Sequence, residues 1–363
     1  RSFGSDPQHV AAFGSALAAG LARGGIAACG KHFPGHGATP GDTHALLPSI
    51  DDDAATLLGR DVAPFAAVAP ECAAIMGTHA LLHAFDERPA TLSQRIVTGL
   101  LRGELGYDGV YVTDCLQMAA LAQWGSPADA AVEALAAGAD LLTISADVTL
   151  AEAIVERIER AVEVGTLPLE RLREAYARVL RLRSTGAAPI ALDAPAPHPG
   201  IGREIGRRAI TRVRGDARTD PTTTTAISFE AAVAEGIETA PAPAATLRHE
   251  APALRELRAP LDPSDDTANV LIEALGGGRR RPLLLARRAH LHPGQARAIA
   301  RIVDAYPDAV VASLLEPWDV AFFGNARHVL AAYGDDAASL GGLADVLFGG
   351  SLAEGRLPVE LPA

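Results

Sequence analysis

The sequence predicts an α/β protein with a largely parallel sheet. In the first half of the chain, short apolar strand-like runs alternate with helical patterns at intervals of roughly thirty residues, about the length of a βαβ unit. Such alternation requires parallel pairing with right-handed crossovers. Polar or charged residues follow several of these runs, and parallel α/β sheets carry their ligand sites at that edge. A proline-rich stretch separates this half from a second half of similar character.

Six helices and four strands are predicted in the first half. The helices are expected at residues 7–24, 54–67, 94–105, 127–137, 150–163 and 169–183, and the strands at 25–30, 72–76, 109–114 and 139–144. The first helix carries apolar side chains at helical spacing and stops at Gly24-Gly25. The fourth has Ser126 as its N-cap and Pro127 in its first position. Four such strand-helix units form half of a (β/α)₈ barrel or most of an open sheet.

Residues 187–200 are predicted to form a linker, because they contain four prolines and no apolar periodicity. We therefore expect one domain at 1–186 and another at 201–363. In the second domain, strands are predicted at 226–229, 282–286 and 309–314, helices at 266–275, 294–306 and 339–347, and loops at 214–225 and 238–247. The second domain is thus expected to be another α/β layer structure.

Composition narrows the possible partners and location. The formal net charge is -12, without long acidic runs, so the surface should repel nucleic acids and anionic membranes. No apolar run is long enough to span a membrane. Cys29, Cys72 and Cys115 are predicted to be reduced, buried thiols, which favours a cytoplasmic location. Because the chain begins with Arg1 in mid-pattern, we expect that a native N-terminus, with any targeting signal, has been removed. The oligomeric state stays open.

Candidate chemistry is concentrated in residues 31–37 (KHFPGHG) and in the nearby Asp42 and His44. Proline and glycine exclude a regular helix here, so we expect a loop with Lys31 and His32 at the carboxyl end of the preceding strand. Asp42 can hydrogen-bond one ring nitrogen of His44 and leave the other for proton transfer, although a solvated polar loop is the simpler alternative. Lys31 is either a ligand donor or a snorkelling lysine.

Asp114 ends an almost wholly apolar strand, so its carboxylate must be solvated, paired or functional. As an alternative, it caps a helix that follows directly. A zinc site is also conceivable, because imidazole and carboxylate are zinc ligands. The candidate ligands are His32, His36, Asp42 and His44. His32 and His36 cannot share a helix face, since proline and glycine lie between them. We therefore expect neither a metal nor an organic cofactor.

These motifs resemble the glycoside hydrolase family 3 β-N-acetylglucosaminidases of bacteria, enzymes that trim peptidoglycan fragments. Residues 31–37 look like the family's KHFPGHG signature, and 41–44 look like its mobile catalytic loop with an Asp-x-His pair. Further similar segments are 89–93, 101–110 and 112–114, which lead to the family's nucleophile, and 344–349 with 355–359, which close its second domain. The resemblance implies the C-terminal portion of a (β/α)₈ barrel, with the N-terminal strands absent from this chain, followed by an α/β sandwich.

The resemblance also implies a role for each candidate residue. Asp114 is expected to be the nucleophile of a retaining, double-displacement reaction. His44 is expected to act as acid and base, with Asp42 fixing its tautomer. The hydroxyls of N-acetylglucosamine would be bound by Arg1, Lys31 and His32.

The implied function is removal of terminal β-linked N-acetylglucosamine, from muropeptides in particular, and the implied partner is a saccharide containing that sugar. Two alternatives stay open. Some relatives with an Asp-His pair transfer the sugar to phosphate, which an imidazole does not repel as a carboxylate would. The chain could instead be a carbohydrate-binding relative without catalysis. A β-glucosidase of the same superfamily is disfavoured, because it would usually draw its acid/base from a carboxylate of the second domain.

Overall fold

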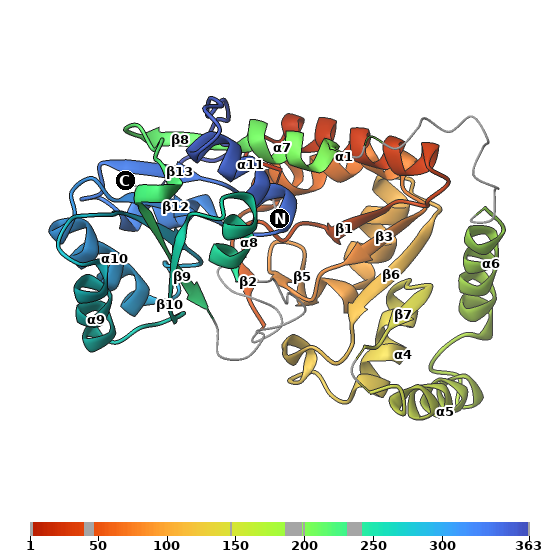
Figure 1. Cartoon of the computed structure of the whole chain (residues 1–363). Coiled ribbons are helices and arrows are strands. Elements are labelled where there is room, and N and C mark those ends of the chain that lie inside the picture. Colours follow the sequence, from red (N-terminus) through yellow and green to blue (C-terminus); the bar gives the residue numbers. More distant parts are fainter. Residues whose placement is uncertain are drawn as a thin grey trace. The chain divides into compact units, whose positions relative to one another are not determined.

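The chain folds into two compact units, Arg1–Pro195 and Ala196–Ala363 (Figure 1). The computed structural model describes residues 3–39, 47–145, 147–185, 198, 200–230 and 242–361. Both units combine helices with parallel strands, which confirms the predicted α/β class. Most of the predicted linker, residues 187–200, lies outside the described residues.

The main sheet of the first unit has four parallel strands in the order β1-β3-β6-β7. These are β1 (Cys29–Phe33), β3 (Ala74–Gly77), β6 (Val110–Cys115) and β7 (Leu141–Thr143). Successive strands of this sheet are neighbours, as the alternation of strand and helix patterns predicts. Because all four run in the same direction, their carboxyl ends meet at one edge of the sheet (Figure 1).

Helical segments connect these strands and follow the last one. They are α1 (Pro7–Arg23), α2 (Ala54–Leu57), the π-helix η1 (Leu58–Val62), α3 (Ala63–Val68), η2 (Ala69–Glu71), η3 (Ala90–Leu92), the π-helix η4 (Arg95–Glu104), η5 (Ala119–Leu121), α4 (Pro127–Ala137), α5 (Leu150–Glu163) and α6 (Leu169–Thr185). Helix α4 has the predicted bounds, and the Ser126 side chain caps it by accepting from the Asp129 N–H. A small second sheet contains β2 (Ser49–Ile50), β4 (Leu81–Leu82) and β5 (Asp86–Pro89).

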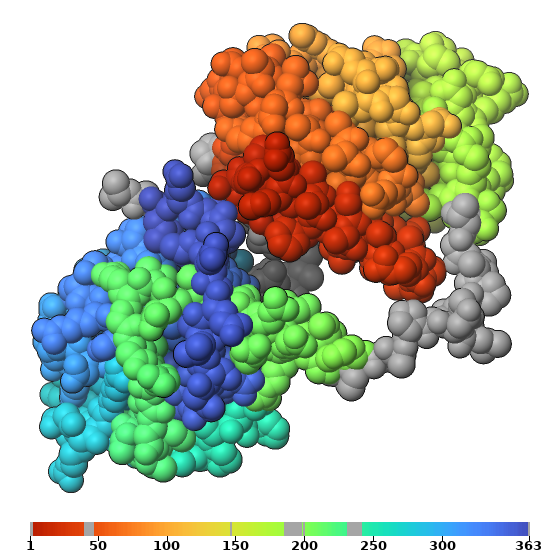
Figure 2. Space-filling view, turned by 90° about the horizontal axis from the view of Figure 1, so that it is seen from above, coloured from red at the N-terminus to blue at the C-terminus, as the bar shows by residue number. Residues whose placement is uncertain are grey.

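The core of this unit forms between the sheet and its helices. Phe33, Ile75 and Tyr111, from three adjacent strands, are fully buried in one apolar cluster. Helix α1 packs against α3, and Figure 2 shows this helix in red against the orange segments that follow it in the same unit. The sheet therefore packs against helices through apolar side chains, while the carboxyl ends of its strands carry polar residues.

Strand β1 begins at Cys29, so the predicted strand at 25–30 was placed too early. The backbone N–H groups of Gly25 and Ile26 donate to the carbonyls of Ala22 (3.0 Å) and Leu21 (2.9 Å), and so close the end of α1 instead of joining a sheet. The pairing of β1 with β3 runs as far as Phe33. Lys31 and His32 consequently lie inside the strand, near its carboxyl end, and not on a loop beyond it.

The second unit contains a six-stranded sheet in the order β10-β9-β11-β12-β13-β8. Its strands are β8 (Thr211–Arg214), β9 (Thr224–Glu230), β10 (Arg255–Pro260), β11 (Arg281–Ala286), β12 (Val310–Ser313) and β13 (His328–Ala331). Five are parallel, and β8 is antiparallel to β13. The helical segments are α7 (Ile201–Ala209), η6 (Pro221–Thr223), α8 (Pro243–Glu250), α9 (Asp265–Leu275), α10 (Pro293–Ala305), η7 (Pro317–Phe322) and α11 (Ala337–Leu347).

Successive residues of the central strands enter two separate apolar cores. Leu283 and Leu285 pack with residues of α8 and α11, whereas Leu284 and Ala286 pack with residues of α9 and α10. This alternation is the period-two pattern of a strand that is buried on both faces. Helices therefore cover the two faces of the sheet.

Two predicted loops of the second unit contain regular structure. Residues 214–225 include the end of β8, all of η6 and the start of β9, and residues 238–247 include the first part of α8. Strands β8, β10 and β13 were not predicted either. Since β8 and β10 are the two edge strands of this sheet, they tolerate arginine and glutamate side chains that hide the apolar alternation on which strand prediction depends.

The three cysteines are free, but only Cys72 is buried; Cys115 is half-buried and Cys29 is exposed. The prediction of buried thiols was therefore wrong for Cys29, which lies on an edge strand of the four-stranded sheet. Across the described ranges, no helix combines the length and the hydropathy that crossing a membrane would require.

Candidate active site

Asp114 and His32 face each other at the carboxyl edge of the four-stranded sheet. Asp114 is the fifth residue of β6, and His32 lies near the end of β1. The Nε2 atom of His32 is 3.5 Å from Oδ2 of Asp114, and the two side chains are 14% and 21% exposed. Both groups are therefore shielded from bulk water and still reachable by a ligand.

The second carboxylate oxygen of Asp114 is bound locally. Oδ1 accepts a hydrogen bond of 2.8 Å from the backbone N–H of Cys115. The four preceding residues of β6 are buried and fix the strand. The alternative that Asp114 caps a helix is wrong, since β6 continues to Cys115 and the next helical segment begins at Ala119. Oδ2 is the oxygen that points toward His32.

The second imidazole of the KHFPGHG segment joins this group. The ring centroids of His32 and His36 are 5.4 Å apart. Nδ1 of His36 lies 2.9 Å from the hydroxyl of Thr78, which directly follows β3. Lys31 is exposed on β1. The structure thus groups His32, His36 and Thr78 beside Asp114 at one sheet edge, and Lys31 precedes His32 on β1.

His79 is a buried member of the site that the sequence analysis missed. Its side chain is almost inaccessible, with 1% of the residue exposed. Nε2 lies 3.0 Å from the carbonyl oxygen of Cys115, and Nδ1 lies 3.0 Å from Oγ1 of Thr91. Burial lowers the pKa of His79, although the Cys115 carbonyl and the Asp114 carboxylate act in the opposite direction. The available signal was its position, two residues after a strand that ends at Gly77.

Cys115, the residue after Asp114, contacts the segment that follows β7. Sγ of Cys115 lies 3.0 Å from Oγ of Ser145, just beyond β7. The Ser145 N–H donates to Oε1 of Gln117 over 2.9 Å. These contacts tie the segment after β6 to the segment after β7, so the residue that follows Asp114 is held from two directions.

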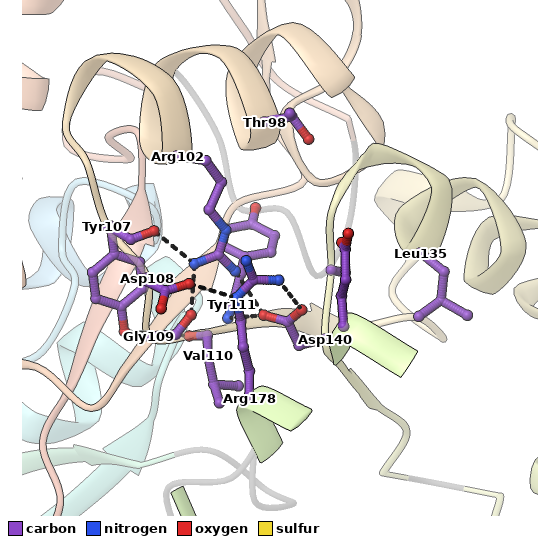
Figure 3. A network of polar contacts seen from close by, with 12 residues as sticks. Thr98, Arg102, Tyr107, Asp108, Gly109, Val110, Tyr111, Leu135, Asp140 and Arg178 are labelled. Atoms are coloured by element: carbon purple, nitrogen blue, oxygen red, sulfur yellow. Dashed lines mark hydrogen bonds and ion pairs between the residues drawn. The ribbon is translucent and has the colours of Figure 1, made fainter. Parts of the chain in front are cut away.

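A buried network of ion pairs anchors the start of β6, the end of the strand that is opposite Asp114 (Figure 3). The carboxylate of Asp140 is fully buried and binds Arg102 at 2.6 Å, Arg171 at 2.5 Å and Arg178 at 3.4 Å. Arg102 also donates to the carbonyls of Tyr107 (2.8 Å) and Gly109 (2.6 Å), immediately before β6. The strand that carries Asp114 is therefore anchored by charge as well as by its sheet partners.

Three predicted site residues, Arg1, Asp42 and His44, lie outside the described residues. Two of the four candidate zinc ligands are among them. Within the part of the chain that the structure describes, no group of three or more His, Cys, Asp and Glu side chains could hold a metal ion. The described site can offer a carboxylate to an electrophile and several hydrogen-bond donors to a polar ligand.

Comparison with known proteins agrees with this chemistry. The glycosyl hydrolase family 3 N-terminal domain matches residues 1–182. A beta-hexosaminidase of Chromobacterium violaceum is 41% identical over 173 residues, which are 44% of this chain and 48% of that protein. Beta-hexosaminidase A of Pseudoalteromonas piscicida is 34% identical over 244 residues, which are 60% of this chain and 41% of that protein.

A solved structure extends the likeness to the second unit. The glycoside hydrolase family 3 beta-N-acetylglucosaminidase from Paenibacillus sp. str. FPU-7 has a TM-score of 0.89 at 30% identity, over 99% of this chain and 72% of that one.

The fold and site define an α/β protein with a carboxylate and imidazoles at the carboxyl ends of parallel strands. Because the family domain covers half of the sequence, the chain belongs to glycosyl hydrolase family 3. It spans about half the length of the curated relatives it matches.

Proposed function

We propose that this chain carries the catalytic residues of a retaining glycosidase that removes terminal β-linked N-acetylglucosamine. The observation that carries the proposal is the partly exposed Asp114 carboxylate, which faces His32 at 3.5 Å at the carboxyl edge of the sheet. The relatives named beta-hexosaminidase and the Paenibacillus beta-N-acetylglucosaminidase support this sugar. No metal or organic cofactor takes part in the proposed reaction.

Asp114 acts as the nucleophile in the first displacement. Its oxygen Oδ2 attacks the anomeric carbon, a new bond forms between them, and the bond from that carbon to the leaving oxygen breaks. Oδ1 stays bound to the Cys115 N–H, so the carboxylate is presented in one orientation. The intermediate is a covalent glycosyl-enzyme.

His44 acts as the acid and then as the base, and Asp42 fixes its tautomer. In the first step the imidazolium gives its proton to the leaving oxygen. In the second step the neutral imidazole takes a proton from water while the water oxygen attacks the anomeric carbon and the bond to Asp114 breaks. An imidazole with an ordinary pKa of about 6.5 suits both halves of this cycle near neutral pH. These two residues are proposed from the sequence motif alone.

Arg1, Lys31 and His32 bind the hydroxyls of the sugar. Lys31 and His32 lie at the same sheet edge as Asp114, which supports their part of this proposal. The natural substrate is a muropeptide fragment of peptidoglycan. The chain has a formal net charge of -12, so the substrate is recognised by contacts within the site and not by long-range attraction of an anion.

The two units correspond to proposed domains of different roles. Residues 1–186 form the C-terminal portion of a (β/α)₈ barrel and contain every proposed catalytic residue. Residues 187–200 form a linker, and 201–363 form an α/β sandwich domain. The consecutive parallel order β1-β3-β6-β7 supports a barrel, because consecutive strands are neighbours in that architecture.

The first experiment is hydrolysis of 4-nitrophenyl N-acetyl-β-glucosaminide by the natural protein at full length, including any segment that precedes Arg1. The corresponding glucoside serves as the substrate control, and Asp114→Ala as the variant control. We expect release from the glucosaminide and a loss of kcat on the order of 10⁴-fold or more in the variant, with an unchanged melting temperature. Full activity of Asp114→Ala would overturn the assignment.

The same assay, run with and without inorganic phosphate, separates the alternative reactions. Hydrolysis is expected to be indifferent to phosphate. Release that depends on phosphate, with formation of a sugar 1-phosphate, would identify a phosphorylase instead. Binding of N-acetylglucosamine without any release would identify a carbohydrate-binding relative that lacks catalysis.

A further inference from the structure

Each ring nitrogen of the buried His79 imidazole lies 3.0 Å from a hydrogen-bond partner. One contact joins Nε2 to the carbonyl of Cys115, the residue after Asp114, and the other joins Nδ1 to Thr91 in the middle of η3. A buried imidazole needs hydrogen-bond partners for its ring nitrogens, and here one of those partners belongs to the strand that carries Asp114. His79 therefore connects two structural elements through the residue next to Asp114.

Cys115 is bound at both of its backbone groups. Its N–H donates to Oδ1 of Asp114 at 2.8 Å, and its carbonyl lies 3.0 Å from Nε2 of His79. We propose that His79 is a positioning residue for Asp114, because it fixes the Cys115 carbonyl and thereby the N–H that orients the Asp114 carboxylate. This inference rests on the proposed function, in which Asp114 is the nucleophile.

The hydrogen bonds define the tautomer of His79. A carbonyl oxygen only accepts, so Nε2 carries the proton that it donates to Cys115. Burial lowers the pKa of His79 and favours the neutral ring, so Nδ1 accepts from the hydroxyl of Thr91. That hydroxyl also donates to the Thr78 carbonyl over 2.7 Å, so its single proton is shared between this carbonyl and Nδ1 of His79.

This arrangement predicts which substitutions keep the function of His79. The amide nitrogen of glutamine reaches about as far as Nε2, so His79→Gln can still donate to the Cys115 carbonyl. Asparagine is one methylene shorter and can replace only Nδ1. A purely structural role would make the two variants fail together, in proportion to their loss of stability. A positioning role makes the asparagine variant the poorer catalyst at equal stability.

The test measures kcat, KM and melting temperature for His79→Asn and His79→Gln with the chromogenic glucosaminide and the natural protein at full length. We expect His79→Asn to lower kcat by about 10- to 100-fold, because a small misplacement of a reacting group costs that much, while KM stays close to the wild-type value. His79→Gln is expected to recover most of that loss. Matched controls are His83→Asn and His83→Gln, since His83 is 39% exposed and bonds Glu87 on the surface.

Thr91→Val provides a second route if His79→Asn fails to fold. It removes the hydroxyl that holds Nδ1 and leaves the imidazole in place, so a smaller fall in kcat with unchanged KM is expected. Wild-type kcat in Thr91→Val and in whichever His79 variants fold would overturn the positioning role. Asp114→Ala, assayed in parallel, separates the two claims: if that variant keeps its activity, the proposed function fails, whereas an inactive Asp114→Ala beside a fully active His79→Asn rejects only the role of His79.

Discussion

Asp140 and Tyr111 are joined by two hydrogen bonds, one to the Asp140 side chain and one between their backbones. The Tyr111 N–H donates to Oδ2 of Asp140 at 2.9 Å, and the Asp140 N–H donates to the Tyr111 carbonyl at 2.9 Å. The same carboxylate accepts from three arginines contributed by η4 and α6 (Figure 3). A single buried carboxylate thus joins β6 and two helices to the residue that precedes β7. Its contact on β6, Tyr111, lies three residues before the proposed nucleophile Asp114.

Asp140→Asn is expected to lower the free energy of unfolding of the first unit by about 3–5 kcal/mol. The amide can still accept the Tyr111 N–H, but three guanidinium groups, each less than a fifth exposed, lose the buried anion that they share. Arg171 and Arg178 keep only the more exposed carboxylates of Glu174 and Asp108. Urea unfolding can be followed through Trp124 in a Trp318→Phe background, because the chain has two tryptophans, one in each unit.

The control is Asp108→Asn, which removes a carboxylate from the edge of the same arginine group. Asp108 is 72% exposed and pairs with Arg178 and Arg181. Screening by water limits such pairs to about 1 kcal/mol or less. Equal losses in the two variants would contradict the assignment of Asp140 as the anchor.

Gly77→Ala is expected to destabilise the first unit by about 1–3 kcal/mol, as overpacking of a core does. A Cβ at position 77 would collide with the hydroxyl of Tyr111, which is fully buried. The cost should shrink in a Tyr111→Phe background, because that change removes the colliding oxygen. Urea unfolding of the two single variants and the double variant measures this coupling.

Gly59→Ala is the matched control for this substitution. Gly59 lies in η1, and a Cβ there would meet no atom within 4 Å. The variant should be as stable as the wild type or slightly more stable. A cost for Gly77→Ala that is the same with tyrosine or phenylalanine at position 111 would show that the collision with the hydroxyl is not the cause, because the ring carbon Cζ, 2.7 Å from the added Cβ, is present in both.

His32→Ala is expected to raise KM for the glucosaminide about tenfold or more, because it removes a hydrogen bond to the sugar next to a charged group. The proposed role is binding, so kcat should fall less than kcat/KM. His9→Ala, a change at an exposed histidine of α1, is the control and should leave both constants unchanged. Steady-state kinetics over a range of substrate concentrations measure the difference. A fall in kcat alone would assign His32 to the chemical step instead.

The pKa of His290 is expected to lie above the ordinary histidine pKa of about 6.5. Its Nδ1 is 2.7 Å from Oδ1 of the fully buried Asp319, and this hydrogen bond raises the pKa of His290. Because the folded pKa exceeds the unfolded one, the pair stabilises the second unit fully below about pH 6.5, and the contribution is lost as the pH rises through the folded pKa. An NMR titration of the His290 ring measures the midpoint.

Asp319→Asn provides the comparison for that titration. The amide no longer stabilises the imidazolium, so the midpoint of His290 should move to a lower pH. The free energy of unfolding of the second unit should then depend less on pH in the range just above the ordinary pKa of histidine. A wild-type midpoint at or below about 6.5 would contradict the expectation.

Local sequence signals predicted some elements closely. Helix α4 was found with its bounds and its Ser126 cap, because capping depends on residues within one turn. Asp114 and His32 were both selected as candidates, since charged or imidazole groups beside apolar runs are unusual. Their 3.5 Å approach could not be derived, because it depends on the order of three strands in the sheet.

Elements that depend on distant partners were missed. Strand β8 needs β13 as its neighbour, and its TRVR sequence has no apolar alternation of its own. Helix α8 begins in a Pro-Ala stretch that reads as a loop, and it is helical because Ala244 and Leu247 are buried against the sheet. His79 was passed over for the same reason: its two partners, Thr91 and Cys115, lie 12 and 36 residues away.

The antiparallel pairing of β8 with β13 constrains how the second unit can fold during synthesis. Strand β8 is the earliest strand that the structure describes in this unit, and β13 is the latest. The sheet edge therefore closes only after His328–Ala331 has emerged from the ribosome. A nascent chain that ends before this point leaves β8 without its strand partner and β12 unpaired on one side, so the unit is exposed to mispairing and chaperone capture until nearly all of it has been translated.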